Sequence, residues 1–213
     1  RATFISTDSF ASVGSLSPLF SFLFLKGKCR YCGTKLSVQY PVIEFTNGLL
    51  YIILFAINGI NVESVLYCFF VSALLVISVI DFRTMEIPVG INVFILCLGV
   101  VHTIYDYENW AHYVIGFFTA SLFLLLCLII TRGKGIGGGD IKLMAVAGLM
   151  IGWQNIMLAL VIGCVVGSVI QCLIIAITKK KDRFAMGPYL SIGIFIALSY
   201  GSEIISWYLN LMM

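Results

Sequence analysis

The stretch Gly135-Ile-Gly-Gly-Gly-Asp-Ile-Lys-Leu-Met-Ala145 places a carboxylate, Asp140, among four glycines at the start of an apolar run. An ionisable side chain at membrane depth costs about 2.5 kcal/mol or more on insertion scales, so it needs a partner, a water-filled cavity or a neighbour that shares a proton. A second carboxylate, Asp81, ends another apolar run in Ser78-Val-Ile-Asp-Phe-Arg-Thr-Met-Glu-Ile-Pro88. The two aspartates are therefore the first candidates for a functional site.

The composition is that of an integral membrane protein. Of the 213 residues, 61% are hydrophobic and 11% are charged, whereas a soluble domain carries about 25% charged residues. The apolar stretches have the length of spanning helices and lack the alternating pattern of a membrane barrel. We predict an all-α fold, a polytopic membrane helical bundle with about seven spanning helices, or eight if another precedes Arg1. The predicted spans are 42–58, 63–80, 88–105, 110–131, 139–153, 155–178 and 186–208.

Basic residues gather on one side of this topology. If the spans alternate in direction, every Lys and Arg except Arg1 falls on that side, and the opposite loops carry acidic residues but no basic one. The basic loops are those around 26–41, 81–87, 132–142 and 179–185. The positive-inside rule places this side in the cytoplasm. Asp81 and Asp140 are then expected at the same depth on the cytoplasmic side, although 59 residues separate them.

Two carboxylates held a few ångströms apart in a partly dehydrated site titrate as a coupled pair that shares one proton. One can act as the base that activates water for attack on a peptide carbonyl, and the other as the acid that protonates the leaving amine. The sequence has no H-E-x-x-H helix and no G-x-S-x-G turn, and its two histidines, His102 and His112, fall near the outer face. This pattern disfavours metal-dependent and Ser-His hydrolysis.

Each aspartate alone also has a structural interpretation. An aspartate that precedes a helix, as Asp140 does, is typical of an N-cap, and Asp81 is placed for an interfacial ion pair with Arg83. Together, at matched depth, the two favour a functional role. The alternative to proteolysis is an ion-coupled membrane transporter or channel that uses both aspartates as ion ligands.

Four motifs follow one another along the chain. They are Gly27-Lys-Cys-Arg-Tyr-Cys-Gly33 with Tyr40-Pro-Val-Ile-Glu44, Asp81 with Ile87-Pro88, Gly137-Gly-Gly-Asp-Ile-Lys-Leu-Met-Ala145 with Gly148 and Gly152-Trp153, and Gly187-Pro-Tyr-Leu-Ser191. Together they resemble the type IV prepilin peptidases, which are bacterial members of the GxGD intramembrane aspartyl proteases. The resemblance extends from about residue 17 to residue 191, which is most of the chain.

The resemblance implies a cytosolic N-terminal region over 1–41 and a transmembrane aspartyl peptidase domain over 42–213. It implies removal of the basic leader of type IV prepilins or pseudopilins at the cytoplasmic face of the bacterial cytoplasmic (inner) membrane. Asp81 and Asp140 would be catalytic, without any cofactor for proteolysis. The residues expected to support this active site are Gly137, Gly138, Gly139, Lys142, Pro88, Gly187 and Pro188.

Many members of that family also methylate the new N-terminus from S-adenosylmethionine, and the resemblance alone suggests this second activity. The partners it implies are the pilin substrates and the lipid bilayer, with no nucleic acid. For Lys142, an equally good interpretation is contact with lipid headgroups.

Two of the seven cysteines, Cys29 and Cys32, form a C-x-x-C in a basic loop, and the other five lie inside apolar runs. A structural zinc site normally needs four ligands. The family commonly has two such cysteine pairs, and this chain has one. We therefore expect no metal, and the alternative is a half-site at Cys29 and Cys32 that another group would have to complete.

Overall fold

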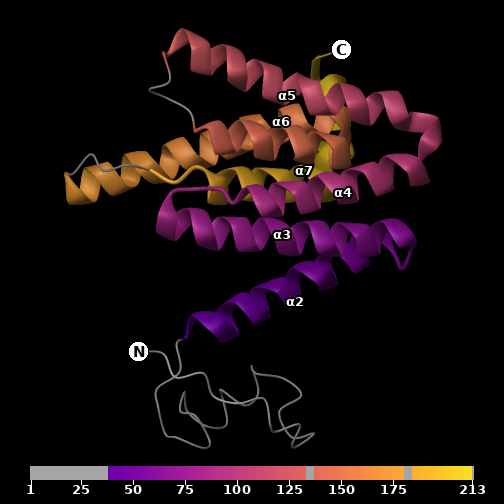
Figure 1. Cartoon of the computed structure of the whole chain (residues 1–213), viewed down its shortest axis with the longest axis horizontal. Coiled ribbons are helices and arrows are strands. Elements are labelled where there is room, and N and C mark those ends of the chain that lie inside the picture. Colours follow the sequence, from indigo (N-terminus) through magenta and orange to yellow (C-terminus); the bar gives the residue numbers. More distant parts are fainter. Residues whose placement is uncertain (1–37, 133–136, 180–183, 213) are drawn as a thin grey trace, which may run out of the picture. The chain divides into compact units, whose positions relative to one another are not determined.

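The computed structural model describes residues 38–132, 137–179 and 184–212, and within these ranges it consists of helices without any strand (Figure 1). The helices are α2 (Gln39–Asn58), α3 (Val62–Thr84), α4 (Val89–Tyr105), the 3-10 helix η1 (Tyr107–Asn109), α5 (Trp110–Ile130), α6 (Gly138–Thr178) and α7 (Gly187–Met212). The predicted all-α class is confirmed.

The chain forms two compact units, residues 1–49 and 50–213, and the boundary falls inside α2. Of the first unit, the structure describes residues 38–49, which form the first half of α2. The second unit contains the rest of α2 and helices α3 to α7, so it holds both candidate aspartates. The predicted division between residues 41 and 42 stays a prediction.

Five of the described helices are long and apolar enough to cross a membrane: α2, α3, α5 with η1, α6 and α7. Helix α4 is apolar but has only 17 residues. Helix α6 has 41 residues, about 60 Å at 1.5 Å per residue, which is twice the thickness of a bilayer core. It turns back at Gly152, which divides it into a first arm (138–151) and a second arm (153–178). These two arms and the other five α-helices correspond to the seven predicted segments.

The reversal of α6 depends on Gly152. Its backbone has φ 77° and ψ 173°, and a Cβ at this position would overlap the imidazole of His112 on α5. The sequence predicted two separate helices here, the first ending at residue 153 and the second beginning at residue 155. The structure instead turns the chain at Gly152 without a loop, because only glycine accepts this φ at low cost and leaves room for the histidine ring.

The two arms of α6 pack against different neighbours. On the first arm, Gly148 lies so close to Gly116 of α5 that a Cβ on either glycine would overlap the backbone of the other. On the second arm, the backbone of Ala159 and Gly163 lies in the same way against Gly193 of α7. Small residues let membrane helices approach closely and replace side-chain burial by backbone packing.

The core of the second unit lies along the first arm of α6, where every residue from Leu143 to Gly152 is buried. Helix α6 contacts α4, α5 and α7, and α3 closes the bundle by packing on α4 and α7. Buried side chains from α3, α4, α5 and α7 complete this core. The first arm is therefore the central element against which the others are ordered.

The turn between α3 and α4 determines where Asp81 lies. Helix α3 is capped by Met85, which has a left-handed φ of 56° and donates its N–H to the carbonyl of Asp81 at 2.8 Å. The chain then runs to Pro88, the N-cap of α4. Asp81 consequently occupies the last turn of α3, at the end of the bundle where α4 begins.

Candidate active site

Asp81 is buried at the end of α3, with 5% of its surface exposed. Its carboxylate Oδ2 accepts a hydrogen bond from the backbone N–H of Gly187 at 2.8 Å. Gly187 is the first residue of α7, so the positive end of that helix points at the carboxylate. A Cβ on Gly187 would lie 2.7 Å from the same oxygen, and the absence of a side chain therefore permits this contact.

Asp140 is the third residue of α6 and is 8% exposed. The N-cap of α6 is Gly137, which has no side chain to cap the helix, so the interpretation of Asp140 as an N-cap is wrong. The carboxylate instead bends back toward Gly137, where a Cβ would lie 3.0 Å from its Oδ2. Asp140 thus occupies the position from which an acidic side chain satisfies the first free N–H of a helix.

The two carboxylates lie close enough for their charges to interact. Contacts around them bring the same elements together: Ile87, just before α4, lies 3.1 Å from where a Cβ of Gly139 would be, and Gly187 binds Asp81. The end of α3 and the starts of α4, α6 and α7 therefore meet at one place. We call this place, defined by Asp81, Asp140 and Gly187, the aspartate end of the bundle.

Some of the other residues predicted to support the site lie at this junction, and others are partly buried or exposed. Gly139, Gly187 and Pro88 lie at the junction of the four elements, where Gly139 and Gly187 make close contacts and Pro88 starts α4. Pro188 follows Gly187 in the first turn of α7 and is partly buried. The backbone of Gly137 contacts the Asp140 carboxylate. Gly138 and Lys142 are exposed, and their support of the site stays a prediction.

Two polar residues near this site were missed by the sequence analysis as functional candidates. Ser191 on α7 is buried, and its hydroxyl donates to the carbonyl of Leu74 on α3 at 3.5 Å, which ties the two helices together. Asn92 on α4 is also buried, with 5% of its surface exposed. The available signal was a polar residue within the predicted span 88–105, four positions after Pro88.

No group of three or more His, Cys, Asp or Glu side chains suited to a metal ion occurs in residues 38–132, 137–179 and 184–212. Cys29 and Cys32 lie outside these ranges, so the alternative of a half-site there stays open. Within the described part of the chain, the site consists of carboxylates and backbone N–H groups.

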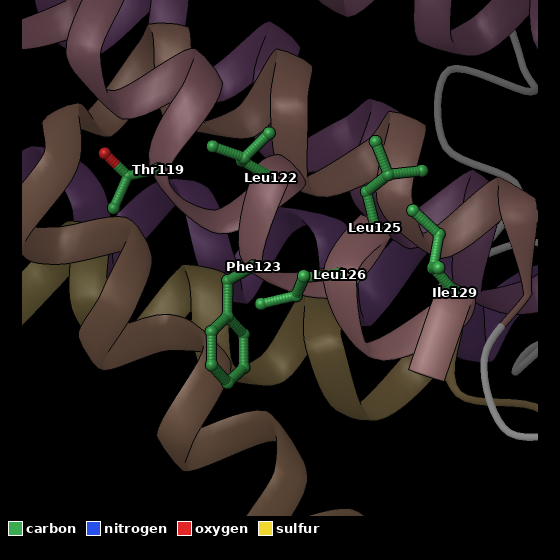
Figure 2. Close-up of a pocket in the computed structure, with 6 residues that line it drawn as sticks. All are labelled: Thr119, Leu122, Phe123, Leu125, Leu126 and Ile129. Carbon is green, nitrogen blue, oxygen red and sulfur yellow. The ribbon is translucent and has the colours of Figure 1, made fainter. Parts of the chain in front are cut away.

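A hollow of about 560 Å³ lies on the outer surface of α5, and neither aspartate lines it (Figure 2). Its lining consists of Thr119, Leu122, Phe123, Leu125, Leu126 and Ile129. The Thr119 hydroxyl is engaged with the carbonyl of Ile115, which leaves an apolar surface. Exposed apolar side chains of this kind suit contact with lipid, so we do not assign a catalytic role to the hollow.

The opposite end of the bundle carries a second polar cluster, which we call the histidine end and define by His102, His112 and Asp106. His102 is fully buried, and its Nε2 lies 3.2 Å from the hydroxyl of Tyr67. Its ring also makes an edge-to-face contact with Tyr113, at 4.9 Å between centroids. The sequence predicted both histidines near the outer face, and in the structure His102 lies in the last turn of α4 and His112 lies against Gly152.

Asp106 is the acidic member of the histidine end. Its carboxylate accepts hydrogen bonds from the hydroxyl of Tyr113 at 2.6 Å and from the amide of Asn109 at 3.1 Å. The bond from Tyr113 holds the pKa of Asp106 below its ordinary value. Both donors are neutral, and they satisfy the carboxylate as an anion.

The fold and the site define a class of protein, a polytopic helical membrane protein with two buried carboxylates brought together from distant helices. Family comparison agrees with this class. The type IV leader peptidase family matches residues 68–172, and the bacterial peptidase A24 N-terminal domain matches residues 10–57. The chain belongs to the type IV leader peptidase family.

Individual relatives give the same result. The chain is 33% identical over 199 residues to the prepilin leader peptidase/N-methyltransferase of Bacillus subtilis (strain 168). The aligned region covers 92% of this chain and 80% of the relative. It is 30% identical over 194 residues to the protein of the same name from Pseudomonas putida, covering 88% and 67% of the two chains. No solved structure matches significantly. These relatives give no support to the alternative of a transporter or channel.

Proposed function

We propose that this protein is a membrane aspartyl endopeptidase that removes the basic leader peptide of type IV prepilins or pseudopilins, with Asp81 and Asp140 as its catalytic residues. The observation that carries the proposal is the pair itself. The two aspartates are 59 residues apart in sequence and come from different helices. Each is more than nine-tenths buried, and they lie within range of each other's charge. Burial of two like charges is costly and is retained in membrane proteins for function.

The chemistry follows from the different roles that two neighbouring carboxyl groups can take. With one proton between them, the ionised group accepts a proton from water as the water oxygen attacks the peptide carbonyl carbon. The protonated group donates to the carbonyl oxygen and stabilises the tetrahedral intermediate. As the C–N bond breaks, the leaving nitrogen takes up a proton, and a carboxylic acid and an amine are released.

The backbone N–H groups at the helix starts support this chemistry. The N–H of Gly187 donates to Asp81, and the backbone of Gly137 engages Asp140. Such bonds fix the orientation of each carboxylate while its second oxygen remains available for water or substrate. The positive ends of α6 and α7 also favour negative charge as it develops at this place.

The proposal includes a second reaction at the new N-terminus of the product. The relatives named above carry N-methyltransferase in their names, and we extend this activity to the present chain, with S-adenosylmethionine as the methyl donor. The names of the relatives alone support this extension, and we assign no residue to it.

The proteolytic proposal is tested by cleavage of a pilin-like substrate, a peptide with a basic leader followed by an apolar helix, by the purified protein in lipid. Asp81→Asn and Asp140→Asn should each abolish cleavage while the protein stays folded by circular dichroism. Asp106→Asn, at the histidine end, is the matched control and should cleave at close to the wild-type rate. Substantial cleavage by Asp140→Asn would show that the mechanism is wrong.

We further propose that the aspartate end faces the cytoplasm in the bacterial inner membrane. The basic residues support this orientation, because Arg83, Arg132 and Lys142 all follow or precede helix ends on the side of Asp81 and Asp140. In intact cells, the cysteine introduced by Thr84→Cys should be protected from a membrane-impermeant thiol reagent. The cysteine introduced by Glu108→Cys should react with it. Reaction of position 84 from outside would reverse the proposed orientation.

A further inference from the structure

Asn92 is a buried polar residue whose side chain has nothing to pair with in the described protein. It is 5% exposed, and neither its amide Nδ2 nor its Oδ1 has a hydrogen-bond partner among residues 38–132, 137–179 and 184–212. A buried amide that makes no hydrogen bond loses its interactions with water and gains nothing in return. Ser191, by comparison, is buried on α7 and does find a partner. Two other buried side-chain atoms of the described residues also lack a partner, His102 Nδ1 and Ser199 Oγ. Of these three residues, Asn92 is the one in the first turn of α4, near the aspartate end.

The register between α4 and α6 shows where this amide lies. Ile87 contacts Gly139, and Gly99 contacts the side chain of Leu149, so α4 runs parallel to the first arm of α6. Asn92 precedes Gly99 by seven residues, or close to two turns, and so lies on the same face of α4, toward α6. Its backbone N–H forms the first hydrogen bond of α4, to the carbonyl of Pro88. Asn92 is thus in the first turn of α4, about 6 Å along the helix axis from Pro88.

This position lies inward of the two carboxylates along the bundle. Because Gly139 is level with Ile87, Asp140 is close to the start of α4, and Asn92 lies roughly one turn further into the membrane. A bound substrate has its basic leader on the side of the loops and its apolar segment on the side of the membrane. The part of the substrate that passes Asn92 is therefore the segment on the carboxyl side of the cleaved bond.

A substrate helix has to unwind before two carboxyl groups can reach one of its peptide bonds. Unwinding leaves backbone N–H and C=O groups unpaired in a region with little water, which is unfavourable unless the protein supplies partners. The amide of an asparagine carries a donor and an acceptor in one plane, the same pair that a peptide group presents. It can pair with one residue of an extended chain as a neighbouring β-strand would.

We infer that Asn92 is a substrate-binding residue whose amide pairs with the main-chain N–H and C=O of the unwound substrate. An extended chain advances about 3.3 Å per residue, so an offset of about one helical turn corresponds to the second residue on the carboxyl side of the cleaved bond. This inference rests on the proposed function, and it adds a binding contact to the catalytic pair.

The test compares Asn92→Leu with the wild type. Leucine has a similar volume and no polar atom, so cleavage should fall by about 10-fold to 100-fold in kcat/KM, the loss expected for one or two hydrogen bonds. Thermal stability should stay unchanged or rise, because an unpaired amide is removed from the free protein. The matched control is Ser199→Ala on α7, which removes another buried and unpartnered polar atom, the Ser199 Oγ, twelve residues along the helix from Gly187. It should leave cleavage unchanged.

A change in the substrate identifies the contact itself. Replacement of the N–H of the second residue after the cleaved bond by an ester oxygen should slow the wild type by about 3-fold to 10-fold and should not slow Asn92→Leu further. Wild-type cleavage by Asn92→Leu, a loss of its thermal stability, or an equal response of both proteins to the ester would each overturn the inference. Cleavage that persists in Asp140→Asn would instead overturn the proposed function, so the two failures are distinguishable.

Discussion

At the histidine end of the bundle, the carboxylate of Asp106 accepts hydrogen bonds from Tyr113 and Asn109, and buried His102 lies against the hydroxyl of Tyr67. At the aspartate end, Asp81 and Asp140 are both buried and are placed where their charges act on each other. The first cluster is arranged so that neutral donors satisfy polar groups. The second places two groups of like charge together.

The difference separates two uses of polar residues in a membrane bundle. Hydrogen bonds from neutral donors, such as those that Tyr113 and Asn109 give to Asp106, stabilise the fold because they satisfy polar groups. A carboxylate pair weakens the fold in the same setting unless it holds a proton, and it is retained for the chemistry that the proton allows. The two ends should therefore respond in opposite ways to substitution: the aspartate end in activity and the histidine end in stability.

The largest expected effect is on cleavage, at the aspartate end. The double substitution of Asp81→Asn with Asp140→Asn should be no less active than either single change, because the two residues act as one unit and each alone removes the reaction. The loss should be at least about 10²-fold to 10⁴-fold, the contribution typical of acid and base groups. Thermal unfolding of all three variants should match or exceed that of the wild type. Lower stability together with residual cleavage would mean that the pair is structural, and the comparison would fail.

A stability effect of intermediate size is expected next to the histidine end, at Gly152. Gly152→Ala places a Cβ at φ 77° and against the ring of His112. This backbone conformation is essentially restricted to glycine and costs another residue about 1–3 kcal/mol. The overlap costs about 1–3 kcal/mol more, so unfolding should become about 2–6 kcal/mol easier. Addition of His112→Ala should restore the part due to overlap and leave the part due to the backbone.

The control for this prediction is Gly48→Ala. Gly48 is a helical glycine on α2 with nothing within 4 Å of where its Cβ would be. Alanine there should be neutral or stabilising by up to about 1 kcal/mol. An equal change of stability in both variants would show that the reversal of α6 tolerates a side chain at Gly152.

The smallest effect is expected at Asp106, in the dependence of stability on pH. Its pKa in the folded protein is lower than in the unfolded chain because Tyr113 donates a hydrogen bond to the ionised group. The folded state is therefore favoured above the ordinary aspartate pKa of about 4, and this stability is lost as the pH falls through the lower folded pKa. Wild-type protein should lose slightly more stability than Asp106→Asn as the pH falls from about 5 to about 2, measured by thermal unfolding. Identical acid profiles would mean that the hydrogen bond contributes nothing.

Local properties of the sequence determined the class of the fold and the two central residues. Apolar segments of spanning length predicted a helical membrane bundle, since backbone groups in lipid must pair within a helix or a closed barrel. The distribution of Lys and Arg predicted that Asp81 and Asp140 lie at the same end, although they are 59 residues apart. The structure brings the two to one junction, and their catalytic role stays a proposal.

The tertiary structure decided what depends on how helices pack. Gly152 is one glycine among twenty in the sequence, and only the structure shows that the chain reverses there with a positive φ and that the ring of His112 leaves no room for a side chain. Asp140 preceded an apolar run and suggested an N-cap, yet the helix begins at Gly138, because backbone N–H groups near a helix start can be satisfied from more than one position. Asn92 was one polar residue in an apolar segment until the register of α4 against α6 placed it about one turn inward of the start of α4. Burial and pairing are properties of contacts between distant segments, and such contacts form only when the helices pack.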